Sequence, residues 1–252
     1  MQKLKDFVEE VMLGSGEIIR RYWDDDTLVT KRKADDSPVT AADCEAELYI
    51  REMITKRFPD HGVIGEEFPD AAKDAEFVWI IDPIDGTKSF ISHVPLFGTL
   101  LGLLHRGQPI LGAINQPIIR ELLIGDNESA TLNGVRTSVR HVETFDEATF
   151  LTTDPELLLR EDQYPGIREL YDSCRLKRTW GDCYGYFLLA TGRADIMIDP
   201  VLAPWDLLPL IPVVRGAGGI ITDLKGDDPV DGDSAVATSP GLHRKVIEVL
   251  GR

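Results

Sequence analysis

The sequence has little cysteine and histidine, and the few residues of each type are scattered. Its three cysteines lie far apart, and no C-x-x-C pair occurs. An odd number of cysteines at wide spacings does not indicate a disulfide framework. The five histidines form no H-x-x-x-H pattern, so a zinc or copper site is not expected. A metal in this protein is therefore expected to be a hard cation on oxygen ligands.

The sequence also lacks long apolar runs and an excess of positive charge. No run approaches the ~20 apolar residues that span a bilayer, and MQKLKDFVEEVM places acids where a signal peptide is apolar. The 43 acidic and 27 basic residues give a net charge of −16, which repels nucleic acid and anionic lipid. We therefore expect a cytoplasmic protein that binds neither nucleic acid nor membranes. Acting on an anionic substrate would require cations at its site.

The first part of the chain, residues 1–145, predicts helices followed by a sheet. Apolar residues at helical spacing indicate a helix over residues 2–23. Thr40 and Asp43 resemble a capping box that begins a second helix. A largely antiparallel sheet follows, with a hairpin signal at Asn133-Gly134. Its strands are expected at residues 78–81, 96–104, 109–115 and 121–124.

The second part, residues 146–252, alternates short elements in the way that is typical of a layered α/β structure. We place the boundary between the parts near residues 141–149, where the pattern changes. The helices are expected at residues 164–173, 185–191, 207–215 and 240–250, and the strands at residues 196–198 and 220–222.

Two aspartates, Asp82 and Asp85, follow the apolar run FVWII. Two carboxylates within a few ångström cannot both stay ionised cheaply, so either one is protonated or a cation lies between them. Pro83 stiffens the turn, and Gly86 lets the chain reverse. An ordinary Asp-rich turn, with Asp85 as the N-cap of a helix, is the alternative interpretation.

Two other acidic segments also lie where an apolar run meets a turn. GEEF places Glu66 and Glu67 after a short apolar stretch, and PWD places Asp206 before a predicted helix. Taken singly, these segments could be a solvated turn and a plain N-cap. One shared site explains them together with DPID, because clustered carboxylates without a basic partner favour Mg²⁺. Two such ions can bridge a phosphate and activate a water molecule.

These motifs resemble those of a known family. GEE, then DPIDGTKSF, then PWDLLPLIPVVRGAGG are similar in order and spacing to the inositol monophosphatase superfamily of Mg²⁺-dependent phosphatases. The similarity covers nearly the whole chain, and D-P-I-D-G-T with a distant W-D is a highly specific pair of motifs. The resemblance implies a layered αβαβα sandwich, a homodimer, a small phosphorylated metabolite as substrate, and two to three Mg²⁺ ions per active site.

The resemblance also implies roles for single residues. Glu66 and Thr87 would orient and deprotonate the attacking water. The backbone N–H groups of Gly86 and Thr87 would meet the phosphate. Asp43 and Glu67 would have supporting roles, although for Asp43 the capping box is an equal alternative. The implied metal ligands are Glu66, Asp82, Asp85, Asp206 and the backbone carbonyl of Ile84.

The second part of the chain carries the features that set the substrate in this superfamily. GDCYGY, residues 181–186, resembles the histidinol-phosphatase branch more than the inositol phosphatases. Asp199 matches the position whose carboxylate meets the alcohol part of the substrate, and Asp182 is a second candidate. The alternatives are a turn residue for Asp199 and a helix cap for Asp182. Histidinol phosphate carries an ammonium and an imidazole, which carboxylates attract.

We therefore expect a phosphate monoester hydrolase, and specifically a histidinol-phosphatase of histidine biosynthesis. It would convert L-histidinol phosphate and water to L-histidinol and phosphate. An inositol-1-phosphate or broad sugar-phosphate phosphatase with the same mechanism is the alternative. A more remote one is a non-catalytic phospho-ligand sensor, which predicts the loss of a metal ligand or of Thr87.

Overall fold

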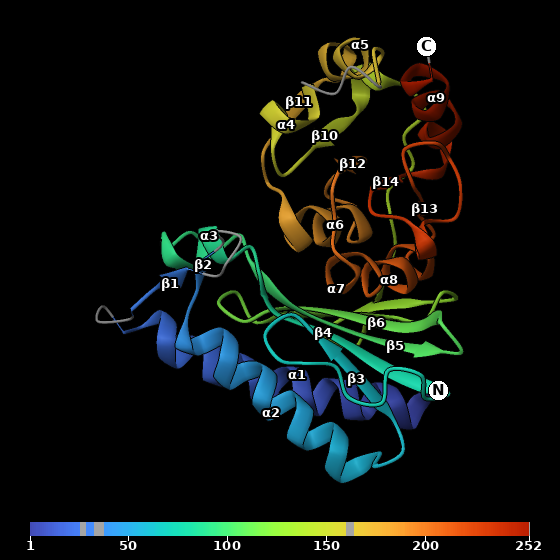
Figure 1. The fold of residues 1–252 in the computed structure, drawn as a ribbon. Coiled ribbons are helices and arrows are strands. Elements are labelled where there is room, and N and C mark those ends of the chain that lie inside the picture. The colour runs from blue at the N-terminus through green and yellow to red at the C-terminus, as the bar shows by residue number, and fades with distance from the viewer. Residues whose placement is uncertain (26–28, 33–37, 160–163, 252) are drawn as a thin grey trace.

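The computed structural model describes residues 1–25, 29–32, 38–159 and 164–251. Layers of helices and layers of sheet alternate from one side of the molecule to the other (Figure 1). This is the αβαβα sandwich that the resemblance implies. In the described part of the chain, no helix is long and apolar enough to cross a bilayer.

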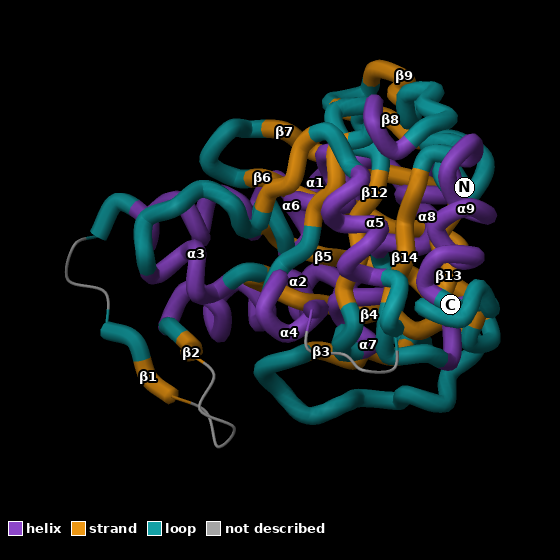
Figure 2. Tube along the Cα trace, turned by 90° about the horizontal axis from the view of Figure 1, so that it is seen from above, coloured by secondary structure: helices purple, strands orange, loops and turns teal. Residues whose placement is uncertain are grey.

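The first layer consists of α1 (Gln2–Trp23) and α2 (Ala41–Arg57), as predicted. α2 begins with the predicted capping box: the Ala42 N–H donates to Thr40 Oγ1 at 3.1 Å, and the Thr40 N–H donates to the Asp43 carboxylate at 2.8 Å. In the chain between the two helices, β1 (Lys31–Arg32) and β2 (Pro38–Val39) pair antiparallel at one edge of the molecule (Figure 2).

The second layer is a sheet of seven strands among the described residues, in the order β3-β4-β5-β6-β7-β8-β9. Only β3 and β4 pair in parallel within it, so the largely antiparallel sheet is confirmed. Asn133 and Gly134 both have positive φ, as a tight two-residue hairpin requires. The bounds are β3 (Gly62–Gly65), β4 (Phe77–Asp85), β5 (Gly98–His105), β6 (Gln108–Gln116), β7 (Glu121–Gly125), β8 (Ala130–Leu132) and β9 (Val135–Thr137).

The third layer is α6 (Asp182–Ala190), α7 (Pro204–Leu207) and α8 (Leu210–Gly216), which lie between the two large sheets (Figure 1). The sequence predicted one helix over residues 207–215, and this prediction is wrong in its bounds. Pro209 has no N–H for an intrahelical bond and its ring crowds the preceding turn, so the chain forms two short helices instead. The helix α3 (Thr87–Ile91) lies outside the layers, directly after β4.

The fourth layer is a mixed sheet of five strands in the described residues, in the order β11-β10-β12-β14-β13. Only β12 and β13 were predicted, and the other three strands, each of which has only three or four residues, were missed. Its strands are β10 (Thr149–Leu151), β11 (Leu176–Arg178), β12 (Ile196–Asp199), β13 (Ile220–Thr222) and β14 (Ala235–Thr238).

The outer layer covers this second sheet and includes the predicted C-terminal helix α9 (Pro240–Leu250), against which α5 packs. The other elements of this half are α4 (Pro155–Leu159), α5 (Ile167–Ser173) and the 3₁₀ turns Phe145–Glu147 and Pro229–Asp231. The seven-stranded sheet ends before residue 145 and the five-stranded sheet begins after it. A division into units 1–145 and 146–252 stays a prediction.

Candidate active site

An irregularity in β4 places Asp82 and Asp85 on the same face of the sheet. Asp82 pairs with Leu100 of β5 and Asp85 pairs with Gly98, so three steps along β4 match two along β5. Such an extra residue is a β-bulge. In a regular strand, side chains three positions apart would point to opposite faces. Pro83 is tolerated here because a bulge does not need every ladder donor.

Hydrogen bonds around the bulge hold its shape. The Ile84 N–H donates to Asp82 Oδ1 at 3.0 Å, and the Thr99 hydroxyl donates to the Pro83 carbonyl at 2.9 Å. The Thr87 hydroxyl donates to the Ile84 carbonyl at 3.0 Å. The sequence predicted that the strand ends before these acids, but β4 continues through them, so they stand on a rigid element.

The helix α7 brings Asp206 to the same place from the second half of the chain. One carboxylate oxygen each of Asp82, Asp85 and Asp206 lie within 4.8 Å of one another. Asp206 is the third residue of α7, whose N-cap is Ala203, so Asp206 is not the N-cap itself. Its carboxylate accepts the Ala203 N–H at 3.0 Å. The Asp85 carboxylate accepts the N–H of Cys183, which ties the first turn of α6 to the cluster.

Burial raises the pKa of every carboxyl group in this cluster, because removal from water disfavours the charged form. The charge of Glu66 adds to this effect on the pKa of Asp82, and the charge of Asp182 adds to it for Asp85. The pKa of Asp206 is raised to about 6 and that of Asp182 to about 7. Ionisation of the cluster is therefore costly unless a cation compensates the charge.

A pocket of about 610 Å³ opens over the cluster. Lys88 is the only basic side chain among the described residues that line it. Sequence reasoning missed Thr153, Asp154 and Thr179, which follow the unrecognised parallel strands β10 and β11. The predicted residues that line the pocket are Glu66, Asp82, Ile84, Asp85, Gly86, Thr87, Asp182 and Asp206.

Asp182 and Asp199 lie in different surroundings. Asp182 lines the pocket as the first residue of α6, with a φ of +50°, and its N–H donates to Thr153 Oγ1 at 2.8 Å. The N-cap of this helix is Gly181, so the cap interpretation of Asp182 is not supported. Asp199 is the last residue of β12 and is buried. Its carboxylate accepts the Thr153 N–H at 3.0 Å and the Tyr186 hydroxyl at 3.1 Å.

Two further predicted residues, Asp43 and Glu67, do not line the pocket. Asp43 is fully buried and serves in the capping box, while its Oδ1 has no hydrogen-bond partner among the described residues. Burial raises the pKa of Asp43 to about 6, and the charge of Glu66 adds to this shift. The Glu67 N–H donates to the carboxylate of Glu47 at 2.9 Å. Glu47 was not predicted, since its spacing to Arg51 looks like an ordinary surface pair on a helix.

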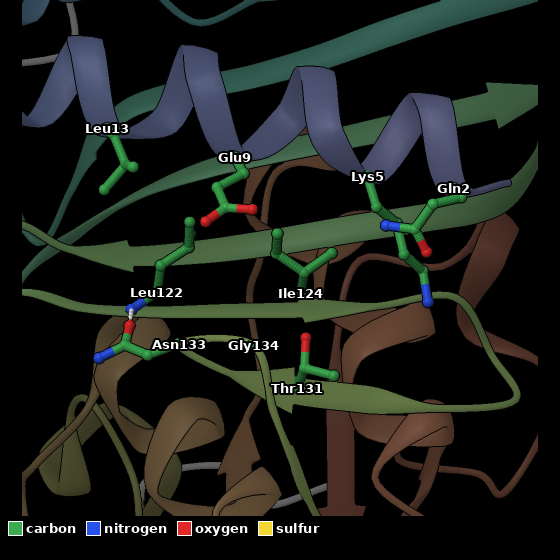
Figure 3. Close-up of a pocket in the computed structure, with 9 residues that line it drawn as sticks. All are labelled: Gln2, Lys5, Glu9, Leu13, Leu122, Ile124, Thr131, Asn133 and Gly134. Carbon is green, nitrogen blue, oxygen red and sulfur yellow. Dashed lines mark hydrogen bonds between the residues drawn. The ribbon is translucent and has the colours of Figure 1, made fainter.

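A second hollow lies between α1 and the β7–β8 region of the sheet (Figure 3). Glu9 and Leu13 of α1 face it on one side, and Leu122 of β7 on the other. Lys5, which also lines it, pairs with Asp126 at 2.7 Å. It contains none of the predicted site residues, so the pocket over β4 is the candidate active site.

Comparisons with known proteins agree with this geometry. A family model described as the inositol monophosphatase family matches residues 1–251. A histidinol-phosphatase of Chlorobaculum parvum is 38% identical over 94% of this chain and 92% of its own. The chloroplastic bifunctional phosphatase IMPL2 of Arabidopsis thaliana is 44% identical over 94% of this chain and 71% of its own. A solved inositol monophosphatase from Zymomonas mobilis has a TM-score of 0.86 at 32% identity and covers 100% of this chain and 98% of its own.

The fold and the acid-lined pocket define a phosphatase built as a layered α/β sandwich. The chain belongs to the inositol monophosphatase family, as its motifs predicted. The predicted fold class and the prediction of a phosphatase are both confirmed.

Proposed function

We propose that the protein is a Mg²⁺-dependent histidinol-phosphatase of histidine biosynthesis, which hydrolyses L-histidinol phosphate to L-histidinol and phosphate. The observation that carries the proposal is the pocket, where three aspartates gather within 4.8 Å and further carboxylates line the walls. The relative from Chlorobaculum parvum, which carries the name histidinol-phosphatase, supports this choice of substrate.

The donor set fits Mg²⁺. Carboxylate and carbonyl oxygens are the ligands of hard cations, and no histidine or cysteine is among the described residues that line the pocket. Two to three ions would supply the positive charge that polarises a phosphate ester and acidifies a water molecule. The proposed ligands are Glu66, Asp82, Asp85, Asp206 and the Ile84 carbonyl.

The protein's own residues would orient the water and the phosphate. The Thr87 hydroxyl donates its proton to Ile84, so its lone pairs can accept a hydrogen bond from the attacking water. Glu66 would take the proton of that water. The N–H groups of Gly86 and Thr87 at the start of α3 have no acceptor within the helix and would bind phosphate oxygens. The water would attack in line with the leaving alcohol, without a phosphoenzyme.

The wall of the pocket near α6 favours a substrate that carries positive charge. Asp182 and Asp154 line this wall, and carboxylates attract the ammonium of histidinol phosphate. In this proposal Asp199 acts on the substrate indirectly, through Thr153. The Asp199 carboxylate accepts the Thr153 N–H, and the Thr153 hydroxyl accepts the Asp182 N–H. Asp182 and Asp199 remain the proposed substrate residues, with Asp43 and Glu67 in support.

The second candidate is a phosphatase for inositol-1-phosphate or for several sugar phosphates, and the similarity to the Zymomonas mobilis structure supports it. The sensor hypothesis loses its basis, because every proposed ligand and Thr87 are present. A cytoplasmic homodimer is part of the proposal, and sedimentation analysis would test the oligomeric state.

The decisive experiment compares phosphate release from L-histidinol phosphate and from inositol-1-phosphate, each with Mg²⁺ and with EDTA. We expect a strong preference for histidinol phosphate that EDTA abolishes. A preference for inositol phosphate, or equal rates, would reject the histidinol substrate and leave the metal mechanism intact. Full activity in EDTA would reject the metal mechanism.

A further inference from the structure

Glu47, in the middle of α2, is a carboxylate that the protein buries completely, at 0% exposure. Burying a charge is costly unless partners compensate it. Burial does raise the pKa of Glu47, while hydrogen bonds from Glu67 and Arg51 oppose the shift. Glu47 does not line the pocket. Its partners therefore have to explain why a carboxylate occupies this position.

All of these partners belong to α2 or to the segment after β3 that carries Glu66. One oxygen of Glu47 accepts the Glu67 N–H at 2.9 Å, and the other accepts Arg51 Nε–H at 2.7 Å. The guanidinium of Arg51 in turn donates to the carbonyls of Phe68 at 3.0 Å and Pro69 at 3.2 Å. Glu47 and Arg51 together bind three backbone groups of one loop, residues 66–69. These groups are the N–H of Glu67 and the carbonyls of Phe68 and Pro69.

The backbone of this loop is adapted to the carboxylate. A Cβ on Gly65 would lie 2.2 Å from Glu47 Oε1, so glycine is what allows the close approach. On its other side, the Glu66 N–H donates to the carbonyl of Ile81 at 3.2 Å. Ile81 immediately precedes Asp82 in β4. Glu66 is therefore held between α2 and the strand that carries the aspartates.

We infer that Glu47 and Arg51 are positioning residues, which keep the backbone of residues 66–69 in the one place from which the Glu66 carboxylate reaches the metal site. This inference rests on the proposed role of Glu66. Removing the outer hydrogen-bond partners of metal ligands typically lowers metal affinity or activity 10–100-fold. Glu47 and Arg51 hold the main chain beside Glu66 instead of its carboxylate, and we expect an effect in the same range.

The test measures Mg²⁺ binding directly, by isothermal titration calorimetry, together with kcat and the Mg²⁺ concentration that gives half-maximal activity. Glu47→Ala and Arg51→Met should weaken Mg²⁺ binding about 10–100-fold. Glu47→Gln should weaken it less, because its amide oxygen can still accept the Glu67 N–H. The matched control is Arg140→Met. It breaks the ion pair between Arg140 and buried Asp195, and neither of these residues lines the pocket.

The control separates positioning from general stability. Arg140→Met should lower the melting temperature, because it leaves buried Asp195 without its cation, and it should leave Mg²⁺ binding of the folded protein unchanged. Unchanged Mg²⁺ binding in folded Arg51→Met and Glu47→Ala would overturn the inference, and so would an equal loss in the control. If Glu47→Ala does not fold, Glu47→Gln and Arg51→Met decide. A wild-type protein that binds Mg²⁺ but releases no phosphate would reject the proposed function alone.

Discussion

Two kinds of carboxylate among the described residues, those paired with an arginine and those of the pocket, lie in contrasting surroundings. Asp195 accepts two hydrogen bonds from the guanidinium of Arg140 and a third from the Thr149 N–H. Glu47 accepts one hydrogen bond from the guanidinium of Arg51 and one from the Glu67 N–H. In each case an arginine compensates the charge, and the remaining oxygen capacity goes to the backbone. The charges of such pairs are compensated without a ligand, and the hydrogen bonds of the pairs connect neighbouring strands, loops and helices.

The pocket aspartates, Asp82, Asp85 and Asp206, are different. In the described part of the chain none of them forms an ion pair with lysine, arginine or histidine. Each instead has a raised pKa, caused first by burial and then by neighbouring carboxylates. The contrast supports the proposal that a cation from solution binds in the pocket, and substitutions in either kind of carboxylate can test it.

The largest expected effect comes from removing a charge in the pocket. Asp85→Asn should lower kcat/KM about a thousandfold or more, because a metal ligand contributes several kcal/mol to the transition state. The same change should raise the melting temperature in EDTA, since it removes a buried repulsion. Steady-state kinetics and thermal melts of the same preparation measure both. Activity with Mg²⁺ within tenfold of wild type would reject Asp85 as a ligand.

The opposite result is expected for the pair that is already compensated. Asp195→Ala removes the ion pair with Arg140, whose side chain is 35% exposed, and leaves the buried Thr149 N–H without its acceptor, so we expect a loss of about 1–3 kcal/mol in the free energy of unfolding. The kcat/KM of the folded protein should not change. Urea unfolding and kinetics measure the two quantities. Asp126→Ala, which breaks a less buried pair with Lys5, is the control and should cost about 1 kcal/mol or less.

A loss of activity without a loss of stability in Asp195→Ala would contradict the distinction between the two kinds of carboxylate. So would a gain in stability, because it would place Asp195 with the pocket aspartates.

The pH dependence of stability gives a smaller but more specific effect. The raised pKa values mean that the folded protein keeps protons that the unfolded chain releases above about pH 4. Without metal, these groups therefore make the protein less stable as pH rises from that value through about 6, the folded pKa of Asp206. Mg²⁺ should cancel this trend, so it should raise the melting temperature more at ~pH 7.5 than at ~pH 5.

The comparison with Mg²⁺ at each pH is needed because other groups oppose the trend. Burial lowers the pKa of His61 and His243, so their contribution to stability is lost as pH falls below about 6.5. These histidines lie outside the pocket, and Mg²⁺ should not alter their contribution. An equal effect of Mg²⁺ at both pH values would mean that the pocket aspartates are not its ligands.

The sequence allowed the pocket aspartates to be identified but not the way in which they meet. The spacing of Asp82 and Asp85 indicated either a protonated carboxyl group or a shared cation, and the acidic segments GEEF and PWD favoured the cation. That both face one side depends on the bulge, which exists only in the pairing of β4 with β5. Asp154 was missed because β10, the strand that precedes it, was not predicted. Glu47 was missed because no local pattern shows that a charged helical residue is buried.

The smallest predicted effect concerns Asp182, which shares features with both kinds of carboxylate because acidic groups and one lysine act on its pKa. The charge of Lys88 lowers its pKa, but burial and the charge of Asp199 dominate and raise it. Asp182→Asn should lower kcat/KM for L-histidinol phosphate about tenfold more than for p-nitrophenyl phosphate, the difference expected for one charged hydrogen bond. Asp199→Ala should show the same selectivity, because it releases Thr153 and with it the main chain of Asp182.

The comparison of two substrates separates recognition from chemistry in this last case. p-Nitrophenyl phosphate shares the phosphate group but has no ammonium, so it measures the metal end of the pocket alone. Equal losses on both substrates in Asp199→Ala would remove Asp199 from substrate recognition and place it with Asp195 as a structural carboxylate. Equal losses in Asp182→Asn would instead assign its charge to the metal cluster, where it already acts on the pKa of Asp85.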